Sequence, residues 1–461
     1  MANFPKDFFW GAAAAAYQIE GSAPIDGKGA CVWDMFSAIP GKTFEGHSGA
    51  SACDHYHRYE ADAAMMSELG IPNYRLSISW PRILPAGRSA INAKGVDFYD
   101  RLVDVLLAKG IQPWVTLFHW DYPYELYKLG GWLNPESPQW FAEYVQIVVE
   151  KLSDRVSRWM TINEPQCFVG LGHQTGYHAP GDRLGLKEVL QAAHHVLIAH
   201  GRAVQVIRSH ARTGPTIGWA PCGAMAMPED ESSSADIEAA RKAVFCFGPG
   251  NPLYSPAEPL WSVAWWSDAA VLGRYPEGEL EVYGGAAPMF TEEEMRTIAQ
   301  PLDFYGVNIY NGTVVRAGGD GGIERVPRAP GAPVTALKWP VTPTSLYWGP
   351  KFLNERYNLP VVVTENGLSG MDWVSLDGRV HDSQRIDFLQ RYLRELDRAI
   401  GDGVDVRGYF QWSIMDNFEW SEGYKERFGL VHVDYETQKR TPKDSAYWYR
   451  DVITTNGRVL Y

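Results

Sequence analysis

Eight short, apolar, β-rich runs recur along the chain and are separated by helical stretches and polar loops. Each run is almost continuously apolar, which is typical of strands buried on both faces of a parallel sheet. The runs are Phe8–Tyr17, Tyr74–Trp80, Pro113–Trp120, Trp159–Asn163, Thr216–Ala220, Phe304–Tyr310, Pro360–Thr364 and Gly408–Ser413.

Segments with a 3.6-residue apolar period lie between several of these runs. In one of them Tyr56 and Met66 fall on the same helical face, and a second pattern begins at Leu102 and is closed by Gly110. Eight β/α units without a break in composition predict an α/β protein formed by a single (β/α)8 TIM barrel with elaborated βα loops. We expect this catalytic barrel to span residues 1–461 as one domain.

Composition excludes several classes of protein. The 461 residues are 45% hydrophobic and 21% charged, as in a compact globular chain. A formal net charge of -13 disfavours nucleic acid and anionic membrane surfaces as partners. No apolar run approaches the roughly 18 residues that span a bilayer, and the run at Phe8 lacks the basic region of a signal peptide. The five cysteines are odd in number and widely spaced, which favours a reducing cytoplasm.

A Gly- and Pro-rich stretch, residues 317–333, is the most linker-like part of the chain. Val314–Arg316 and Ile323–Val326 flank a Gly-Gly-Asp-Gly-Gly turn within it. We expect a surface hairpin that elaborates one barrel loop.

Polar and aromatic side chains stand at the carboxyl ends of seven of the eight runs, where a barrel of this kind has its active face. Amides, imidazole, carboxylates and Trp fit a sugar site, because hydroxyls need donors and acceptors and C–H faces need aromatic platforms. These residues are Gln18, Glu20, Arg75, His119, Trp120, Asn163, Glu164, Asn308, Tyr310, Glu365, Asn366 and Trp412.

Two of these carboxylates suggest the chemistry. Glu164 and Glu365 each end an apolar run, and dividing 461 residues among eight units places them about three strands apart. They should therefore face each other across the barrel mouth. Retaining glycosidases need two carboxyls about 5–5.5 Å apart, one to attack the anomeric carbon and one to protonate the leaving oxygen. A single Glu is more often a capping or salt-bridged residue, but a facing pair ringed by amides and Trp favours catalysis.

At this point the chain resembles a known family, glycoside hydrolase family one, whose largest group is the β-glucosidases. The resemblance covers the whole chain. It is carried by Phe9-Trp10-Gly11, Tyr17-Gln18-Ile19-Glu20-Gly21, Tyr74 to Trp80, Leu117-Phe118-His119-Trp120, Thr161 to Pro165, Thr364 to Gly367 and Asn417-Phe418-Glu419-Trp420.

The resemblance implies a retaining β-glucosidase that removes terminal β-D-glucosyl residues from cellobiose-like oligosaccharides or from aryl and alkyl β-glucosides. Glu365 matches the family's nucleophile, Glu164 its acid/base and Asn163 the amide that binds the 2-hydroxyl. Arg75 and Tyr310 match the groups that keep the nucleophile ionised and oriented. The implied partner is a small-molecule β-glucoside, with no cofactor and no metal.

The resemblance also implies a binding site for the non-reducing sugar, with Trp412 beneath the ring and Glu419 at the outer hydroxyls. Trp339 resembles the aglycone platform, and Phe428 is expected to close the wall behind the glycone. The remaining residues expected to bind substrate are Gln18, His119, Trp120, Asn308 and Trp420.

Several rival functions are disfavoured by these residues. A phospho-glycosidase would carry Ser, Lys and Tyr around Glu419, and a thioglucosidase or a barrel that only binds sugars would lack a catalytic Glu. A metalloenzyme is disfavoured because no H-E-x-x-H motif is present. Its candidate ligands would be Asp54, His55, His57, His194, His195 and His200, which are better explained as core or surface residues.

Asn311-Gly312-Thr313 matches an N-glycosylation sequon, which we interpret as a chance match beside the expected site. The sequence leaves open the preference among glucose, galactose and fucose, the aglycone length, glucose tolerance and the level of transglycosylation. It also leaves the oligomeric state open, including a homo-oligomer.

Overall fold

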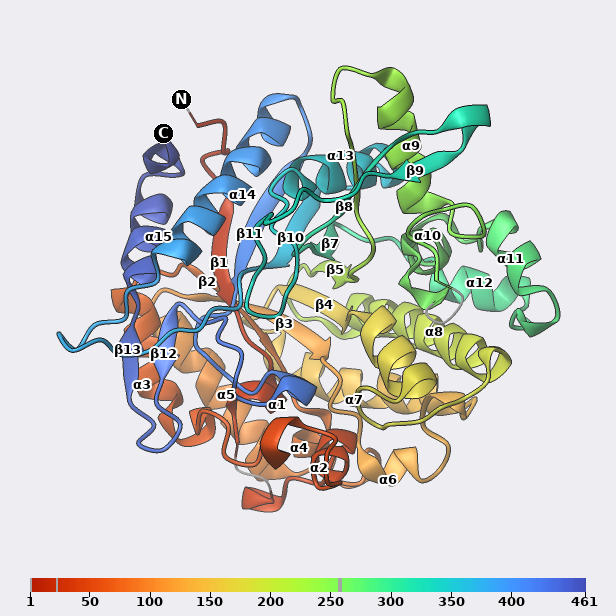
Figure 1. Cartoon of the computed structure of the whole chain (residues 1–461). Helices are drawn as coiled ribbons and strands as arrows, with labels where there is room; N and C mark the ends of the chain where they lie inside the picture. The colour runs from red at the N-terminus through yellow and green to blue at the C-terminus, as the bar shows by residue number, and fades with distance from the viewer. Residues whose placement is uncertain (1, 22–23, 256–258) are drawn as a thin grey trace.

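The computed structural model describes residues 2–21, 24–255 and 259–461. Eight parallel strands form a nearly closed barrel, hydrogen-bonded in the order β5-β4-β3-β2-β1-β11-β10-β7, with helices around it (Figure 1). The barrel strands are β1 (Phe9–Ala13), β2 (Asn73–Ser77), β3 (Gln112–Phe118), β4 (Arg158–Asn163), β5 (Thr216–Ala220), β7 (Tyr305–Asn308), β10 (Val361–Asn366) and β11 (Val406–Trp412).

Backbone hydrogen bonds join the two end strands of this sheet, β5 and β7. The amide of Asp303 donates to the carbonyl of Ile217 over 2.8 Å, and the amide of Asn308 donates to the carbonyl of Pro221 over 2.9 Å. These two bonds bring the end strands together, and the predicted TIM barrel is confirmed.

Helices cover the outside of the barrel, as expected from the apolar periods between the strands. Those expected around Tyr56 and Leu102 are α3 and α5. The longer helices are α3 (His55–Glu68), α5 (Ala93–Ala108), α7 (Ser137–Leu152), α8 (Leu186–His210), α9 (Ser234–Phe245), α13 (Ser345–Tyr357), α14 (Ser383–Gly401) and α15 (Asp444–Thr454). The shorter ones are α1 (Ala16–Ile19), α2 (Val32–Ser37), α4 (Trp80–Ile83), α6 (Tyr124–Tyr127), α10 (Val263–Ser267), α11 (Glu277–Tyr283) and α12 (Glu292–Ile298).

Two of the expected strands extend too far. The run Phe8–Tyr17 contains β1 but continues into α1, and the run Tyr74–Trp80 passes from β2 to the start of α4. A short helix that is buried on all sides has the same apolar signature as a buried strand, so periodicity cannot separate them. As a result Gln18 lies on a helix, and Arg75 lies in the middle of its strand.

The predicted surface hairpin is present. Strand β8 (Thr313–Ala317) pairs antiparallel with β9 (Ile323–Arg325), and β6 (Ala226–Pro228), which was not expected, adds to β8 in parallel. A further small sheet is formed by β12 (Val431–Val433) and β13 (Arg440–Pro442). In the described part of the chain, none of the helices is long and apolar enough to cross a membrane.

Aromatic rings fill the inside of the barrel below the strand ends. Trp114 contacts Phe410 and Phe304 edge-on, with ring centroids 5.0 Å and 5.7 Å away. Met160 and Val362 complete this buried layer. The packed floor leaves the carboxyl ends of the strands to form the cavity described next.

Candidate active site

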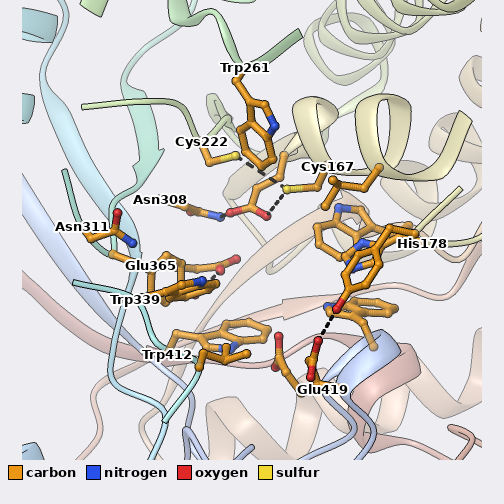
Figure 2. Close-up of a pocket in the computed structure, with 18 of the residues that line it drawn as sticks. Cys167, His178, Cys222, Trp261, Asn308, Asn311, Trp339, Glu365, Trp412 and Glu419 are labelled. Atoms are coloured by element: carbon orange, nitrogen blue, oxygen red, sulfur yellow. Dashed lines mark hydrogen bonds between the residues drawn. The ribbon is translucent and has the colours of Figure 1, made fainter. Parts of the chain in front are cut away.

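A cavity of about 880 Å³ opens at the carboxyl ends of the barrel strands. Eleven of the fourteen residues expected to bind or transform substrate line it: His119, Trp120, Glu164, Asn308, Tyr310, Trp339, Glu365, Trp412, Glu419, Trp420 and Phe428. Figure 2 shows Glu365, Trp339 and Trp412 on one side of the space, with Cys167 and His178 on the other. Gln18, Arg75 and Asn163 lie directly behind this surface and bond to residues that form it.

The two expected catalytic carboxylates project from irregular strand ends. The register of β4 against β5 shifts between Met160 and Asn163, just before Glu164. The register of β10 against β7 shifts between Val363 and Glu365. Irregularities of this kind re-aim side chains next to active sites. They turn both carboxylates into the same cavity.

Each oxygen of the Glu365 carboxylate has a hydrogen-bond donor. Arg75 forms a buried ion pair with Oε1, and the phenol of Tyr310 donates to Oε2 over 2.7 Å. Burial and the neighbouring charges of Glu365 and Glu164 raise the pKa of Tyr310, so this phenol remains a donor. The carboxylate is therefore fixed in position and available to attack an electrophile.

Glu164 receives weaker, neutral donors. Asn308 Nδ2 donates to Oε1 over 2.8 Å, and Cys167 Sγ donates to Oε2 over 3.2 Å. Burial raises the pKa of Glu164 to about 7, with a further contribution from the charge of Glu365. A carboxyl with this pKa holds a proton near neutral pH and can give it up, as a general acid/base must.

An amide network links the two carboxylates. Arg75 donates to Asn163 Oδ1 over 2.6 Å, and Asn308 Nδ2 donates to the same oxygen over 3.1 Å. Asn163 Nδ2 lies 3.2 Å from His119 Nε2. Burial, together with the charge of Arg75, lowers the pKa of His119, which keeps the ring neutral and lets Nε2 accept this bond.

A third carboxyl, Glu419, also lines the cavity. Gln18 Nε2 donates to its Oε2 over 3.3 Å and is also held by the carbonyl of Phe418 over 2.9 Å. Burial, followed by the charges of Glu365 and Glu164, raises the pKa of Glu419 well above its ordinary value. Among the described residues that line the cavity there is no Lys or Arg. An additional anionic group would find no lining cation there.

Aromatic faces form the remaining walls. The ring of Trp339 lies 5.2 Å from that of Tyr310 and 6.1 Å from that of Phe428. The Trp120 and Trp420 rings are 4.5 Å apart, and Trp412 stacks on the His119 imidazole at 5.8 Å. These surfaces suit the C–H faces of a sugar ring and its leaving group.

Three lining residues have a left-handed backbone: Trp120 at φ 75°, Glu164 at φ 42° and Trp420 at φ 51°. A non-glycine residue in this region costs about 1–3 kcal/mol and persists only when its surroundings fix it. Such positions cluster at functional sites, and all three side chains here point into one cavity.

Other strand-end and candidate metal residues have structural partners. Glu20 pairs with Arg82 over 2.9 Å, away from the cavity. Among the histidines, His55 bonds to Asp62 and His200 to Thr161. His194 and His195 bond to a phenol and a backbone carbonyl of the core.

Several residues of the cavity wall were not predicted from the sequence. Cys167 lies on a π-helical segment, Gln166–Thr175. Cys222 follows β5, the one barrel strand at whose end no candidate residue was expected. The other missed residues include Tyr177, His178, Trp261 and Glu422. Cys167 could have been noticed, since it follows Glu164 by three residues. The others lie on loops or on single 3-10 turns, which carry no recognisable pattern.

Comparisons with known proteins agree on one family. The family model described as "Glycosyl hydrolase family 1" matches residues 1–458. Beta-glucosidase A of Thermotoga maritima is 44% identical over 457 residues, which are 99% of this chain and 98% of the relative. Beta-glucosidase A of Acetivibrio thermocellus is 41% identical over 467 residues, which are 99% of each chain.

Solved structures give the same result. A beta-glucosidase from Thermotoga maritima in complex with glucoimidazole superposes with a TM-score of 0.88 at 43% identity, over 98% of this chain and 99% of that one. The same enzyme in complex with deoxynojirimycin gives a TM-score of 0.88 at 42% identity, over 99% and 100% of the chains.

Proposed function

The chain belongs to glycosyl hydrolase family 1 and is a retaining β-glucosidase, and we propose that Glu365 is its nucleophile and Glu164 its acid/base. The observation that carries this assignment is the contrast between the two carboxyls. Glu365 is paired with a cation and a phenol, whereas Glu164 has neutral donors and a pKa raised to about 7.

In the first step the Glu365 carboxylate attacks the anomeric carbon of a β-glucoside. The bond from that carbon to the glycosidic oxygen breaks, and Glu164 gives its proton to the departing oxygen. The products are the free aglycone and a glucosyl ester on Glu365. Arg75 and Tyr310 hold the attacking carboxylate, and we propose that Asn163 binds the 2-hydroxyl.

In the second step Glu164, now ionised, takes a proton from water, and the water oxygen attacks the anomeric carbon. The ester bond breaks, Glu365 regains its charge, and β-glucose leaves. Two inversions give net retention. Glu164 acts as acid in one step and base in the other, which suits a pKa near neutral pH.

The cavity supports a neutral sugar as substrate. We propose that Trp412 lies beneath the glycone, while Glu419, Gln18 and Trp420 bind its outer hydroxyls. Trp339 is proposed as the platform for the aglycone of cellobiose-like or aryl glucosides. The substrate-binding set also includes His119, Trp120, Asn308 and Phe428, which complete the walls.

We further propose that residues 1–461 act as one catalytic domain in the cytoplasm, with a role in cellulose degradation. The five cysteines support a reducing compartment, because all are free thiols and four of them are buried.

Proton NMR of the first product tests the proposed double displacement. Hydrolysis of p-nitrophenyl β-glucoside should release β-glucose before mutarotation forms the α-anomer. If α-glucose appears first, a water molecule has attacked directly and Glu365 is not a nucleophile.

A further inference from the structure

Two thiols and a carboxylate meet in the wall of the cavity. Cys167 Sγ lies 3.8 Å from Cys222 Sγ and 3.2 Å from Glu164 Oε2, and the ligand atoms of the three residues all lie within 4.8 Å of one another. Figure 2 shows the two sulfur atoms turned toward each other above Asn308. Within residues 2–21, 24–255 and 259–461, this is the one set of three metal-ligating side chains that are so close together.

The spacing matches a tetrahedral metal site. Two thiolates bound to one zinc ion at about 2.3 Å, at the tetrahedral angle, have sulfur atoms about 3.8 Å apart. The observed separation is 3.8 Å. Two sulfurs and one carboxylate oxygen are ligands that zinc accepts, and a three-residue set leaves the fourth position free.

The surroundings hold each ligand in this arrangement. The amide of Cys222 donates to Gln166 Oε1 over 3.3 Å, and the Gln166 side chain donates back to the Cys222 carbonyl. Asn308 occupies Oε1 of Glu164, so Oε2 is the oxygen that faces the sulfurs. Cys167 and Cys222 are only 6% and 8% exposed, yet both line the cavity, which gives an ion a path to them.

We propose that Cys167, Cys222 and Glu164 form a binding site for a thiophilic divalent cation of the zinc type, and that its occupation inhibits the enzyme. Binding would release the two thiol protons, and the carboxyl proton wherever Glu164 is protonated, to solvent; it would form two metal–sulfur bonds and one bond to the carboxylate, with water as fourth ligand. Glu164 could then no longer protonate a leaving group. This inhibition rests on the proposed role of Glu164; the binding itself does not.

Binding is tested with freshly reduced protein from which the reductant has been removed. Zn²⁺ titration by calorimetry should show one site per chain, and Co²⁺ should give the intense visible absorption of a tetrahedral sulfur-ligated ion. Cys167→Ser and Cys222→Ser should each weaken Zn²⁺ binding by about 100-fold or more and remove the Co²⁺ signal. Cys246→Ser is the matched control, because Cys246 is exposed and outside the cavity; it should bind like the wild type.

Circular dichroism and a thiol count on each denatured variant establish that folding and reduced cysteines are intact. Equal Zn²⁺ affinity in the wild type and in both cavity variants, or an octahedral Co²⁺ spectrum, would overturn the site. The inhibition is tested by measuring the hydrolysis rate of each protein with Zn²⁺ relative to its own metal-free rate. Zn²⁺ should inhibit the wild type and Cys246→Ser, and should inhibit Cys222→Ser far less. Tight Zn²⁺ binding at these cysteines without inhibition would overturn the inhibitory role alone. Absence of glucosidase activity in the metal-free enzyme would contradict the proposed function and would leave the binding result intact.

Discussion

Tyr310 donates a hydrogen bond from its phenol to Oε2 of Glu365 over 2.7 Å. Arg75 pairs with the other oxygen of the same carboxylate, so Glu365 has one donor on each oxygen and a full positive charge beside it. Glu164 shares the cavity but has no cationic partner in direct contact among the described residues. From this contrast we infer opposite tasks for two chemically identical side chains, with Glu365 as the nucleophile and Glu164 as the proton carrier.

The first prediction concerns the leaving group. Glu164→Ala should lower kcat/KM by about 10²–10⁴-fold for alkyl glucosides and cellobiose, because their alkoxides need a proton to depart. Activated aryl glucosides should lose far less in the glycosylation step. Steady-state kinetics over a series of phenols and alcohols provides the test. A uniform loss across the series would show that Glu164 is not the acid.

The second prediction concerns pH. Burial and the charge of Glu365 raise the pKa of Glu164 to about 7, so its acidic form is the main one below that pH and is lost as pH rises through it. The value of kcat/KM for cellobiose should therefore fall by about tenfold per pH unit on the alkaline side. For a β-glucosyl fluoride, which needs little protonation, the fall should be weaker. A cellobiose profile that stays level well above neutral pH would contradict the assignment.

Much of the fold could be predicted because buried parallel strands leave a clear signal. Thr216–Ala220 was predicted with the bounds that the structure shows, and the other seven strands were found with errors at their ends. The errors at Tyr17 and Trp80 have one cause: a single helical turn packed on all sides is as apolar as a strand. In the sheet formed by β6, β8 and β9, the strand β6 (Ala226–Pro228) was missed because its three residues carry too little pattern, whereas the equally short β9 was marked by the Gly-rich turn before it.

The third prediction concerns the glycone. No Lys or Arg is among the described residues lining the cavity, and Glu419 is one of them. The value of kcat/KM for p-nitrophenyl 6-phospho-β-glucoside should therefore be at least about 100-fold below that for the unphosphorylated glucoside. β-Galactosides and β-fucosides should be slower or comparable substrates. Glu419→Gln is the matched variant. It should reduce the ratio of kcat/KM for the neutral glucoside to kcat/KM for the phosphorylated one, because it loses activity on the neutral sugar. A preference for the phosphorylated sugar would reverse this interpretation of Glu419.

The fourth prediction concerns Gly367, which directly follows β10, the strand that carries Glu365. A Cβ at this position would lie 1.9 Å from the carbonyl oxygen of Trp412, too close for any side chain. Gly367→Ala should lower the free energy of unfolding by about 1–3 kcal/mol, and should lower kcat/KM because Glu365 or Trp412 must move. Gly214→Ala is the control, since no atom lies within 4 Å of its added Cβ, and its unfolding free energy should change by less than about 0.5 kcal/mol. Equal denaturation curves for the two variants would show that the close approach of Gly367 to the Trp412 carbonyl is not needed for stability.

The functional site was predicted less completely than the fold. Strand-end motifs pointed to Glu164 and Glu365, because β4 and β10 place these carboxylates at the barrel mouth. The wall formed by Cys222, His178 and Trp261 comes from loops and a short 3-10 turn, whose course depends on tertiary packing and not on local pattern. The thiol pair appears only when Cys167 and Cys222, distant in sequence, are brought together.

The most direct test of the account is to trap the covalent intermediate. In a 2-deoxy-2-fluoro-β-glucoside the fluorine slows both the formation and the hydrolysis of the glucosyl ester. An activated leaving group restores the rate of formation alone, so the ester should accumulate. Mass spectrometry should show one added fluoroglucosyl group per chain, and peptide mapping should place it on Glu365 within Thr364-Glu365-Asn366-Gly367. A label on Glu164 or Glu419 in place of Glu365, or hydrolysis without any trapped ester, would contradict the assignment of Glu365 as nucleophile.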